Sequence, residues 1–348
     1  MTLSLTLAFC ATLLVAPQEP LEVPNQGPRP HRALKAFQPM LGQWVGRGIA
    51  YDGPGGSPME WTATLVVDRI LDGHGVREQL VVDLGEVLPG GYRSTTFYAF
   101  DPQAGHLVSF ACDNRKGVSR SVATWTGATL LTATLGENQG KLAIERGTFT
   151  FEDGKAHMEV LSMVDTHEGF VMIDGTFEPF EGERRVARDA GTGNSRPRGE
   201  LAKLTSTLGI SRLEGSIIPE PGEAAISMST VERSGLFPGG LALITVVENE
   251  PTPGMPVYQE YRMTSWNTMR KCYDILWMDN MGLSGSMQGW LQDKAYVVVD
   301  SGTYRGKPYA QRTTTILGPK GPAFITSDRL WGVAPGMRVF EGRYQQIK

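Results

Sequence analysis

Residues 92–127 read YRSTTFYAFDPQAGHLVSFACDNRKGVSRSVATWTG, and this stretch decides the fold class. It holds three short runs rich in aromatic and β-branched residues, YRSTTFYAF, HLVSFAC and SVATW. Between them lie DPQAG and DNRKG, which supply Asp, Asn and Gly where a tight hairpin needs positive φ angles. The pattern predicts consecutive antiparallel strands joined by hairpins.

The same pattern continues on both sides of this stretch through the first half of the chain. Further strand-like runs are WTATLVVDRI, VREQLVVDL, LAIERGTFTFE, AHMEVLSMV and FVMIDGTFEPF, with DGHG, EDGK and THEG as separators. About eight to ten short strands with one brief helix before them favour an up-and-down antiparallel barrel. A β-sandwich is the main alternative.

The second half of the chain repeats the first at an offset of about 167 residues. Leu41-Gly42 matches Leu208-Gly209, and each follows a short apolar-periodic segment, ALKAFQPML or LAKLTST, that predicts a capping helix. The remaining landmarks are aromatic pairs and a closing motif: Phe100 with Trp266, Phe110 with Trp277, Trp125 with Trp290, and Gly175/Phe177 with Gly342/Tyr344. An internal repeat of this kind indicates two copies of one domain.

The sequence therefore predicts an all-β protein of two tandem antiparallel up-and-down, lipocalin-like barrels, each with a short N-terminal capping helix. The segment EGERRVARDAGTGNSRPRGE between the copies is rich in Gly, Arg and Pro, which is typical of a linker. The predicted layout is a signal peptide at 1–16, a Pro-rich linker at 17–30, the first barrel at 31–180, a linker at 181–200 and the second barrel at 201–348.

The N-terminal segment MTLSLTLAFCATLLVA is uncharged and apolar and is followed by a Pro-rich run, which predicts a signal peptide and export to the periplasm or the medium. It is shorter than the roughly 20 residues that a spanning helix needs, so we expect no stable membrane span. A permanent anchor and lipid attachment at Cys10 are the alternatives. No Lys or Arg precedes Arg29, which is atypical of a signal peptide.

Composition and motifs narrow the function classes. A net charge of −4 provides no cationic field for phosphates, and no stripe combines aromatic with basic residues, so nucleic acid is not an expected partner. The chain has no Gly-x-Ser-x-Gly elbow, no phosphate-binding loop and no zinc-ligand spacing. We predict no cofactor, no metal and no catalytic residue, and an enzyme that uses Asp113 or Asp279 as a base is the least favoured hypothesis.

Removal of the leader would leave two cysteines, one in each predicted domain: Cys112 and Cys272. They do not form a disulfide framework within either domain. We expect two buried thiols that act as small hydrophobes, with an inter-domain bridge as the alternative.

Two sets of residues carry a family resemblance. Gly42-Gln43-Trp44 opens the first predicted strand and resembles the calycin signature, in which the Trp plugs the closed end of a lipocalin-type barrel; the second copy has Gly209-Ile210-Ser211 there. The stretches YAFDPQAGHLVSFACDN and MTSWNTMRKCYDILWMDN, each followed by Gly-containing turns, a Trp strand and a closing GTF or GRY strand, resemble the bacterial secreted domain-of-unknown-function family 1579. Its members resemble lipocalin-like and nitrobindin-like barrels. The resemblance implies a fold and leaves activity open.

A barrel of this size either holds one small ligand or is filled by its own side chains. The repeated aromatic residues and the Asp-Asn pairs that follow them favour a ligand, although Asp-Asn before a Gly is also ordinary turn chemistry. The candidate ligand-binding residues are Trp44, Phe100, Phe110, Asp113, Trp125, Trp266, Trp277, Asp279 and Trp290.

The leading functional hypothesis is a non-enzymatic binder of a small apolar or amphipathic molecule. The alternative is a structural or interaction module with filled barrels and a protein partner. Two barrels could bind two ligands or present two faces to one partner, and the sequence leaves this open.

Overall fold

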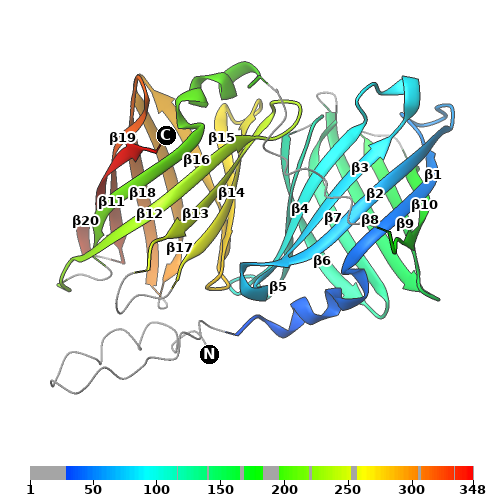
Figure 1. Ribbon diagram of the computed structural model, residues 1–348, viewed down its shortest axis with the longest axis horizontal. Helices are drawn as coiled ribbons and strands as arrows, with labels where there is room; N and C mark the ends of the chain where they lie inside the picture. Colours follow the sequence, from blue (N-terminus) through cyan, green and yellow to red (C-terminus); the bar gives the residue numbers. More distant parts are fainter. Residues whose placement is uncertain are drawn as a thin grey trace.

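The chain forms two closed antiparallel barrels of ten strands each, β1–β10 and β11–β20 (Figure 1). The computed structural model describes residues 29–115, 117–138, 141–164, 168–182, 196–218, 222–251, 257–304, 307–332 and 334–347. In each barrel every strand pairs with its neighbours in sequence, and the first strand pairs with the last. The prediction of two tandem up-and-down barrels is confirmed. The predicted signal peptide and most of both predicted linkers lie outside the described residues.

The strands of the two barrels correspond one to one. The first barrel consists of β1 (Gly42–Ala50), β2 (Met59–Ile70), β3 (Gly75–Asp83), β4 (Tyr92–Asp101), β5 (His106–Asp113), β6 (Gly117–Thr126), β7 (Thr129–Asn138), β8 (Lys141–Glu152), β9 (Lys155–Val164) and β10 (Phe170–Pro179). The second consists of β11 (Gly209–Ile217), β12 (Ile226–Leu236), β13 (Ala242–Asn249), β14 (Gln259–Asn267), β15 (Cys272–Asp279), β16 (Ser284–Gln292), β17 (Ala295–Tyr304), β18 (Lys307–Gly318), β19 (Gly321–Trp331) and β20 (Ala334–Gln346).

A nine-residue 3₁₀ helix precedes each barrel: η1 (Arg32–Met40) and η4 (Gly199–Thr207). Side chains three residues apart lie along one edge of a 3₁₀ helix. The buried residues follow this spacing, with Leu34, Phe37 and Met40 in η1 and Leu201 and Leu204 in η4. Two shorter 3₁₀ turns, η2 (Leu71–Gly73) and η3 (Gly85–Val87), lie in loops of the first barrel.

Each helix closes one end of its barrel with apolar side chains. In the first barrel, Trp44 Nε1 donates a hydrogen bond to the Met40 carbonyl at 2.9 Å, which ties β1 to η1. The Phe37 ring lies 4.8 Å from Tyr98 and meets Trp125 edge-on at 5.4 Å. The capped end of this barrel is therefore filled by aromatic side chains.

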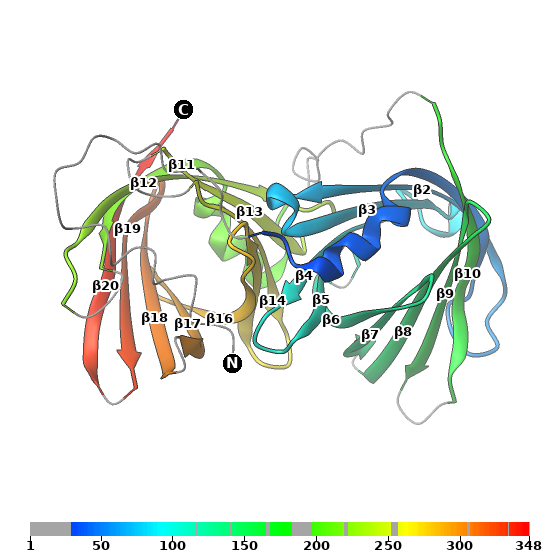
Figure 2. The same cartoon turned by 90° about the horizontal axis from the view of Figure 1, so that it is seen from below.

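The two barrels pack against each other through a buried apolar core (Figure 2). The first barrel contributes the outward-facing Phe97, Val108 and Phe110 from β4 and β5. The second barrel contributes Met263 and Met278 from β14 and β15, among others. This shared core was not predicted from the sequence, which indicated only a linker between the copies.

The packed faces are equivalent in the two copies. The matching positions are Ile70 and Phe237, Gly75 and Ala242, Phe97 and Met263, Phe110 and Leu276, and Cys112 and Met278. In Figure 1, η1 and η4 lie at opposite ends of the pair of barrels. The contact therefore has the character of an isologous interface, in which the same patch is used twice.

Cys112 and Cys272 are both free and buried, so the expectation of two buried thiols is confirmed. Cys112 lies in the core between the barrels. Within the described part of the chain, no helix combines the length and apolar character needed to cross a bilayer.

Candidate functional site

The second lumen, the interior of the barrel β11–β20, changes from apolar to charged along its length. On β14, Met263 points outward into the inter-barrel core, so the alternate positions point inward. From the capped end these inward positions are Trp266, Thr264, Arg262 and Glu260. The charged groups therefore lie away from η4.

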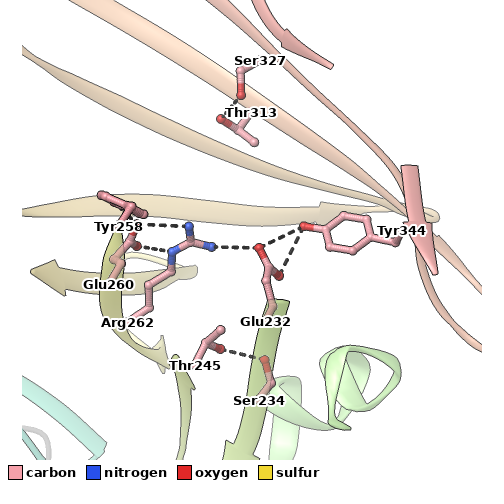
Figure 3. Close-up of polar contacts among 9 residues, drawn as sticks. All are labelled: Glu232, Ser234, Thr245, Tyr258, Glu260, Arg262, Thr313, Ser327 and Tyr344. Atoms are coloured by element: carbon pink, nitrogen blue, oxygen red, sulfur yellow. Dashed lines mark hydrogen bonds and ion pairs between the residues drawn. The ribbon is translucent and has the colours of Figure 1, made fainter. Parts of the chain in front are cut away.

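A network of charged and phenolic side chains crosses this lumen (Figure 3). Glu260 accepts hydrogen bonds from Arg262 Nε and, at 3.3 Å, from Nη2. Tyr258 donates to Glu260 Oε2 at 2.5 Å. On β12, Glu232 Oε1 lies 3.8 Å from Arg262 Nη1, and both Glu232 oxygens lie 3.3 Å from the Tyr344 hydroxyl. All three guanidinium nitrogens of Arg262 therefore face carboxylates.

The charges in this network do not balance. Two carboxylates, Glu232 and Glu260, share one guanidinium, and Glu260 lies opposite Asp279 in the β14–β15 register. Burial raises the pKa of Glu232 and outweighs the opposing effect of Arg262, and burial raises the pKa of Asp279 to about 7. The second lumen therefore has an acidic surplus that a cationic or hydrogen-bond-donating group would neutralise.

Several side chains that face the second lumen keep part of their surface accessible. Arg262 keeps 33% of its side-chain surface accessible although the barrel wall surrounds it, compared with 7% for Glu260. Trp277 and Tyr296 also point inward and are only half-buried. Among the described residues, Trp277 Nε1 and Tyr296 Oη have no hydrogen-bond partner. Both atoms are buried against the barrel wall, so the accessible part of each side chain is the rest of its ring.

Two glycines hold these rings against the wall. A Cβ atom added at Gly285 would lie 2.9 Å from Trp277 Nε1, and one added at Gly289 would lie 2.9 Å from Tyr296 Oη. The rings therefore lie over the bare backbone of β16 and do not extend across the lumen.

Short hydroxyl side chains line other parts of the same wall. Ser234 pairs with Thr245 at 2.8 Å and Thr313 pairs with Ser327 at 2.7 Å (Figure 3). Cross-strand hydroxyl pairs satisfy each other's hydrogen bonds and take up little volume.

The first lumen, the interior of the barrel β1–β10, has a different polar group. Glu78 on β3 accepts a hydrogen bond from the Tyr98 hydroxyl at 3.0 Å. Burial raises the pKa of Glu78 to about 7, against the smaller opposing effect of the Tyr98 bond. No cationic side chain of the described residues contacts this carboxyl, so it stays protonated up to about neutral pH.

The strand registers show which positions of the two barrels are equivalent, and the charged network is absent from the first. Glu232, Glu260, Arg262 and Tyr344 correspond to Leu65, Ser94, Thr96 and Phe177. The same barrel therefore forms with or without the network. A buried ion network is weak evidence for stability, so its presence in one copy points to a role other than folding.

Seven of the nine predicted site residues point inward. Trp44, Phe100 and Trp125 belong to the capped-end core of the first barrel, and Trp266 belongs to that of the second. Trp277 faces the second lumen. Asp113 and Asp279 also point inward, at the ends of β5 and β15 that lie away from the capping helices.

The other two predicted residues point outward. Phe110 is 1% exposed in the inter-barrel core, and Trp290 alternates with the inward Leu291 on β16. The sequence alignment of Phe110 with Trp277 is wrong by one residue, since the registers match Ala111 with Trp277. The alignment of Trp125 with Trp290 fails in the same way, because Trp125 corresponds to Leu291.

The Asp-Asn pairs hold turns together. Asp113 Oδ1 accepts the Arg115 N–H at 2.7 Å, and Asp279 Oδ1 accepts the Met281 N–H at 2.9 Å. Asn114 Oδ1 accepts the N–H of Arg93 at 3.0 Å, and Asn280 repeats this bond in the second copy with the residue that follows Tyr258. These bonds join two loops at the same place in both barrels. They match the alternative named in the sequence analysis, in which Asp-Asn before a Gly stabilises a turn.

The sequence reasoning missed the charged residues of the second lumen. Glu260, Arg262 and Trp266 share one parity in the run QEYRMTSW, and Trp266 was expected to point inward. The period of two was therefore a signal that could have found Glu260 and Arg262. Glu232 and Tyr344 gave no such signal, because their proximity depends on the closure of the barrel.

The similarities of this chain to known proteins are weak. No protein-family model and no curated protein matches the chain. A solved structure of Rv2717c from M. tuberculosis matches with 12% identity over 44% of this chain and 99% of that chain, with a TM-score of 0.35. A protein of unknown function from the DUF3598 family of Nostoc punctiforme matches with 11% identity over 91% of this chain and 100% of that chain, with a TM-score of 0.25. The chain is a tandem β-barrel protein, and similarity at this level carries no functional argument.

Proposed function

We propose that this protein is an exported, non-enzymatic binding protein whose second lumen holds one small amphipathic molecule. The carrying observation is the Glu232–Arg262–Glu260 network, which faces an accessible lumen and is absent from the otherwise equivalent first barrel. The polar head of the ligand would meet this network. Its apolar part would lie against the rings of Trp277 and Tyr296, which are half-buried.

The charge of the network selects the head group. Arg262 has no free face for an anion, because its nitrogens already face Glu260 and Glu232. The carboxylate surplus favours an amine or a hydroxyl head and opposes a carboxylate. This narrows the apolar or amphipathic class expected from the sequence and disfavours fatty acids.

The other two hypotheses have less support. If side chains filled the barrels, inward residues such as Trp277 and Tyr296 would be fully buried, but both are only half-buried. Asp279 as a catalytic base has less support because its Oδ1 accepts N–H groups from Met281 and Leu283, each at 2.9 Å, which is the bonding of a turn residue. Export and kinship with family 1579 remain proposals that rest on the N-terminal segment and on the aromatic motifs.

A matched set of three ligands tests the proposal. Decylamine, decanol and decanoate share one chain length and differ in the head, and each is added below its micelle concentration while thermal unfolding is followed. We expect the amine and the alcohol to raise the Tm and decanoate to do so least; a ligand at 100 times its Kd stabilises by about 2.7 kcal/mol. The matched control is the variant that carries the first-copy residues Leu, Ser, Thr and Phe at positions 232, 260, 262 and 344. Equal responses in wild type and control would refute the site.

Native mass spectrometry of protein purified from its host without detergent tests the rest. Extra mass that is lost on denaturation would identify the class of the natural ligand. A chain mass shortened by the N-terminal segment would support export, and a full-length mass would contradict it.

A further inference from the structure

A groove of about 370 Å³ lies between the two barrels, outside both lumens. Its walls come from the β3–β4 loop, the β5–β6 turn, the residue before η4 and the β12–β13 loop. The three charged residues that line it are all arginines, Arg93, Arg115 and Arg198. No carboxylate of the described residues lines the groove.

The three guanidinium groups have no counter-charge in the described part of the chain. None of them forms an ion pair there, although the protein as a whole carries a net charge of −4. Two carboxylates lie two residues away in sequence: Asp113 points into the first lumen and accepts the backbone N–H of Arg115, and Glu200 pairs with Lys203 at 2.5 Å. All three arginines are exposed, and three like charges around one cleft raise its potential and favour a bound anion.

The walls of the groove are fixed by close backbone contacts between the barrels. A Cβ atom added at Gly239 would lie 2.9 Å from the Asn114 carbonyl oxygen, and one added at Gly240 would lie 2.0 Å from that of Arg196. The Arg198 N–H donates to the Gly240 carbonyl at 2.9 Å. The arginines are therefore anchored on backbone that the inter-barrel contact holds in place.

The second copy provides an internal comparison. Arg93 corresponds to Gln259, because the backbone N–H of each is bound by the Asn of its Asp-Asn pair. Arg115 corresponds to Met281, because the N–H of each is bound by the Asp. Arg198 precedes η4 as His31 precedes η1, and burial together with Arg32 lowers the pKa of His31.

The fold does not require arginine at any of these positions, since the equivalent positions on the other side of the interface carry an amide, a thioether and an imidazole. We propose that the groove is a binding site for a small oxyanion with two or more negative charges, such as a phosphate or polycarboxylate group. Planar guanidinium groups bind such oxygens in pairs. The groove has the volume of a small-molecule site and exceeds that of a bare phosphate ion.

Isothermal titration calorimetry of the full chain at low ionic strength tests this site, with pyrophosphate and citrate as the two probes. The site variant is Arg93→Gln with Arg115→Met, which installs the residues that the second copy already tolerates. The control is Arg343→Gln, which removes an exposed charge on β20. Circular dichroism and Tm measurements establish that each variant folds.

We expect at least one probe to bind wild type, and the site variant to lose affinity by about tenfold or more while the control changes by less than about twofold. Added salt should weaken binding to wild type. Three results would overturn the proposal: neither probe binds wild type, the site variant binds as well as wild type, or the control loses as much as the site variant. None of these results bears on the second lumen, which is tested with uncharged and cationic amphiphiles.

Discussion

Replacing Arg262 alone should destabilise the protein, whereas replacing the whole charged network of the second lumen should leave its stability nearly unchanged or raise it. Arg262→Met leaves Glu232 and Glu260 facing each other without a cation. Breaking a buried pair in this way costs about 3–5 kcal/mol, and because a third of the Arg262 side chain is accessible we expect about 3 kcal/mol. Replacing the network by the first-copy residues, with Glu232→Leu, Glu260→Ser, Arg262→Thr and Tyr344→Phe, leaves no unpaired charge. The free energy of unfolding of this variant should lie within about 1 kcal/mol of wild type or above it.

Urea unfolding at pH 7, followed by circular dichroism and tryptophan fluorescence, separates these outcomes. The cost of Arg262→Met should shrink at pH 5, because burial raises the pKa of Glu232 and protonation then removes the unpaired charge. The four-residue variant should show no such recovery. If it loses as much stability as Arg262→Met, the network is needed for folding and the functional reasoning fails.

Three further predictions concern the first barrel and the contact between the barrels. Phe110→Ala should lower the free energy of unfolding by about 3–5 kcal/mol and split one thermal transition into two. The control Val122→Ala, at a 50% exposed position, should change the free energy of unfolding by less than about 0.5 kcal/mol. An unsplit transition of Phe110→Ala in calorimetry would contradict a coupling role for the inter-barrel core. Glu78 has a pKa of about 7 in the folded protein and an ordinary value near 4.5, so the folded state binds the extra proton and stability falls as pH rises between these values, by up to about 3 kcal/mol. Glu78→Gln should flatten that slope in urea titrations, and an unchanged slope would exclude this carboxyl as its source. Asn114→Ala and Asn280→Ala should each lower the free energy of unfolding by about 1–2 kcal/mol, because each removes the hydrogen bonds that join two loops. A loss of ligand binding without a loss of stability would contradict the turn role of these residues.

Local patterns predicted the barrels because, in an up-and-down topology, strands that are neighbours in sequence also pair with each other. Hairpin turns such as DPQAG and DNRKG join strands that also pair in space, so chain order and spatial order agree. The capping helices were predicted from the apolar spacing before Gly42 and Gly209. Strand number and the repeat needed no long-range information.

The side-chain faces could not be predicted with the same success. A shift of one residue moves a strand side chain to the opposite face, and the aromatic alignment of Phe110 with Trp277 made this error. The outward-facing Phe97 and Phe110 are covered by the second barrel, and nothing local distinguishes such a face from a lumen wall. The network joining Glu232 to Arg262 depends on β12 and β14 lying two strands apart in a closed sheet.

The two copies differ most where their differences cannot affect the barrel. The outward faces that meet at the interface stay apolar in both copies, since each must cover the other. The inward faces have diverged, with Glu78 and Tyr98 in the first lumen and the Glu232–Arg262–Glu260 network in the second. Side chains that merely filled the interior would be expected to stay apolar, because burying charge is costly. Under the proposed function, this divergence predicts that the ligand of the second lumen does not bind in the first, so ligand stoichiometry should be measured for each barrel separately.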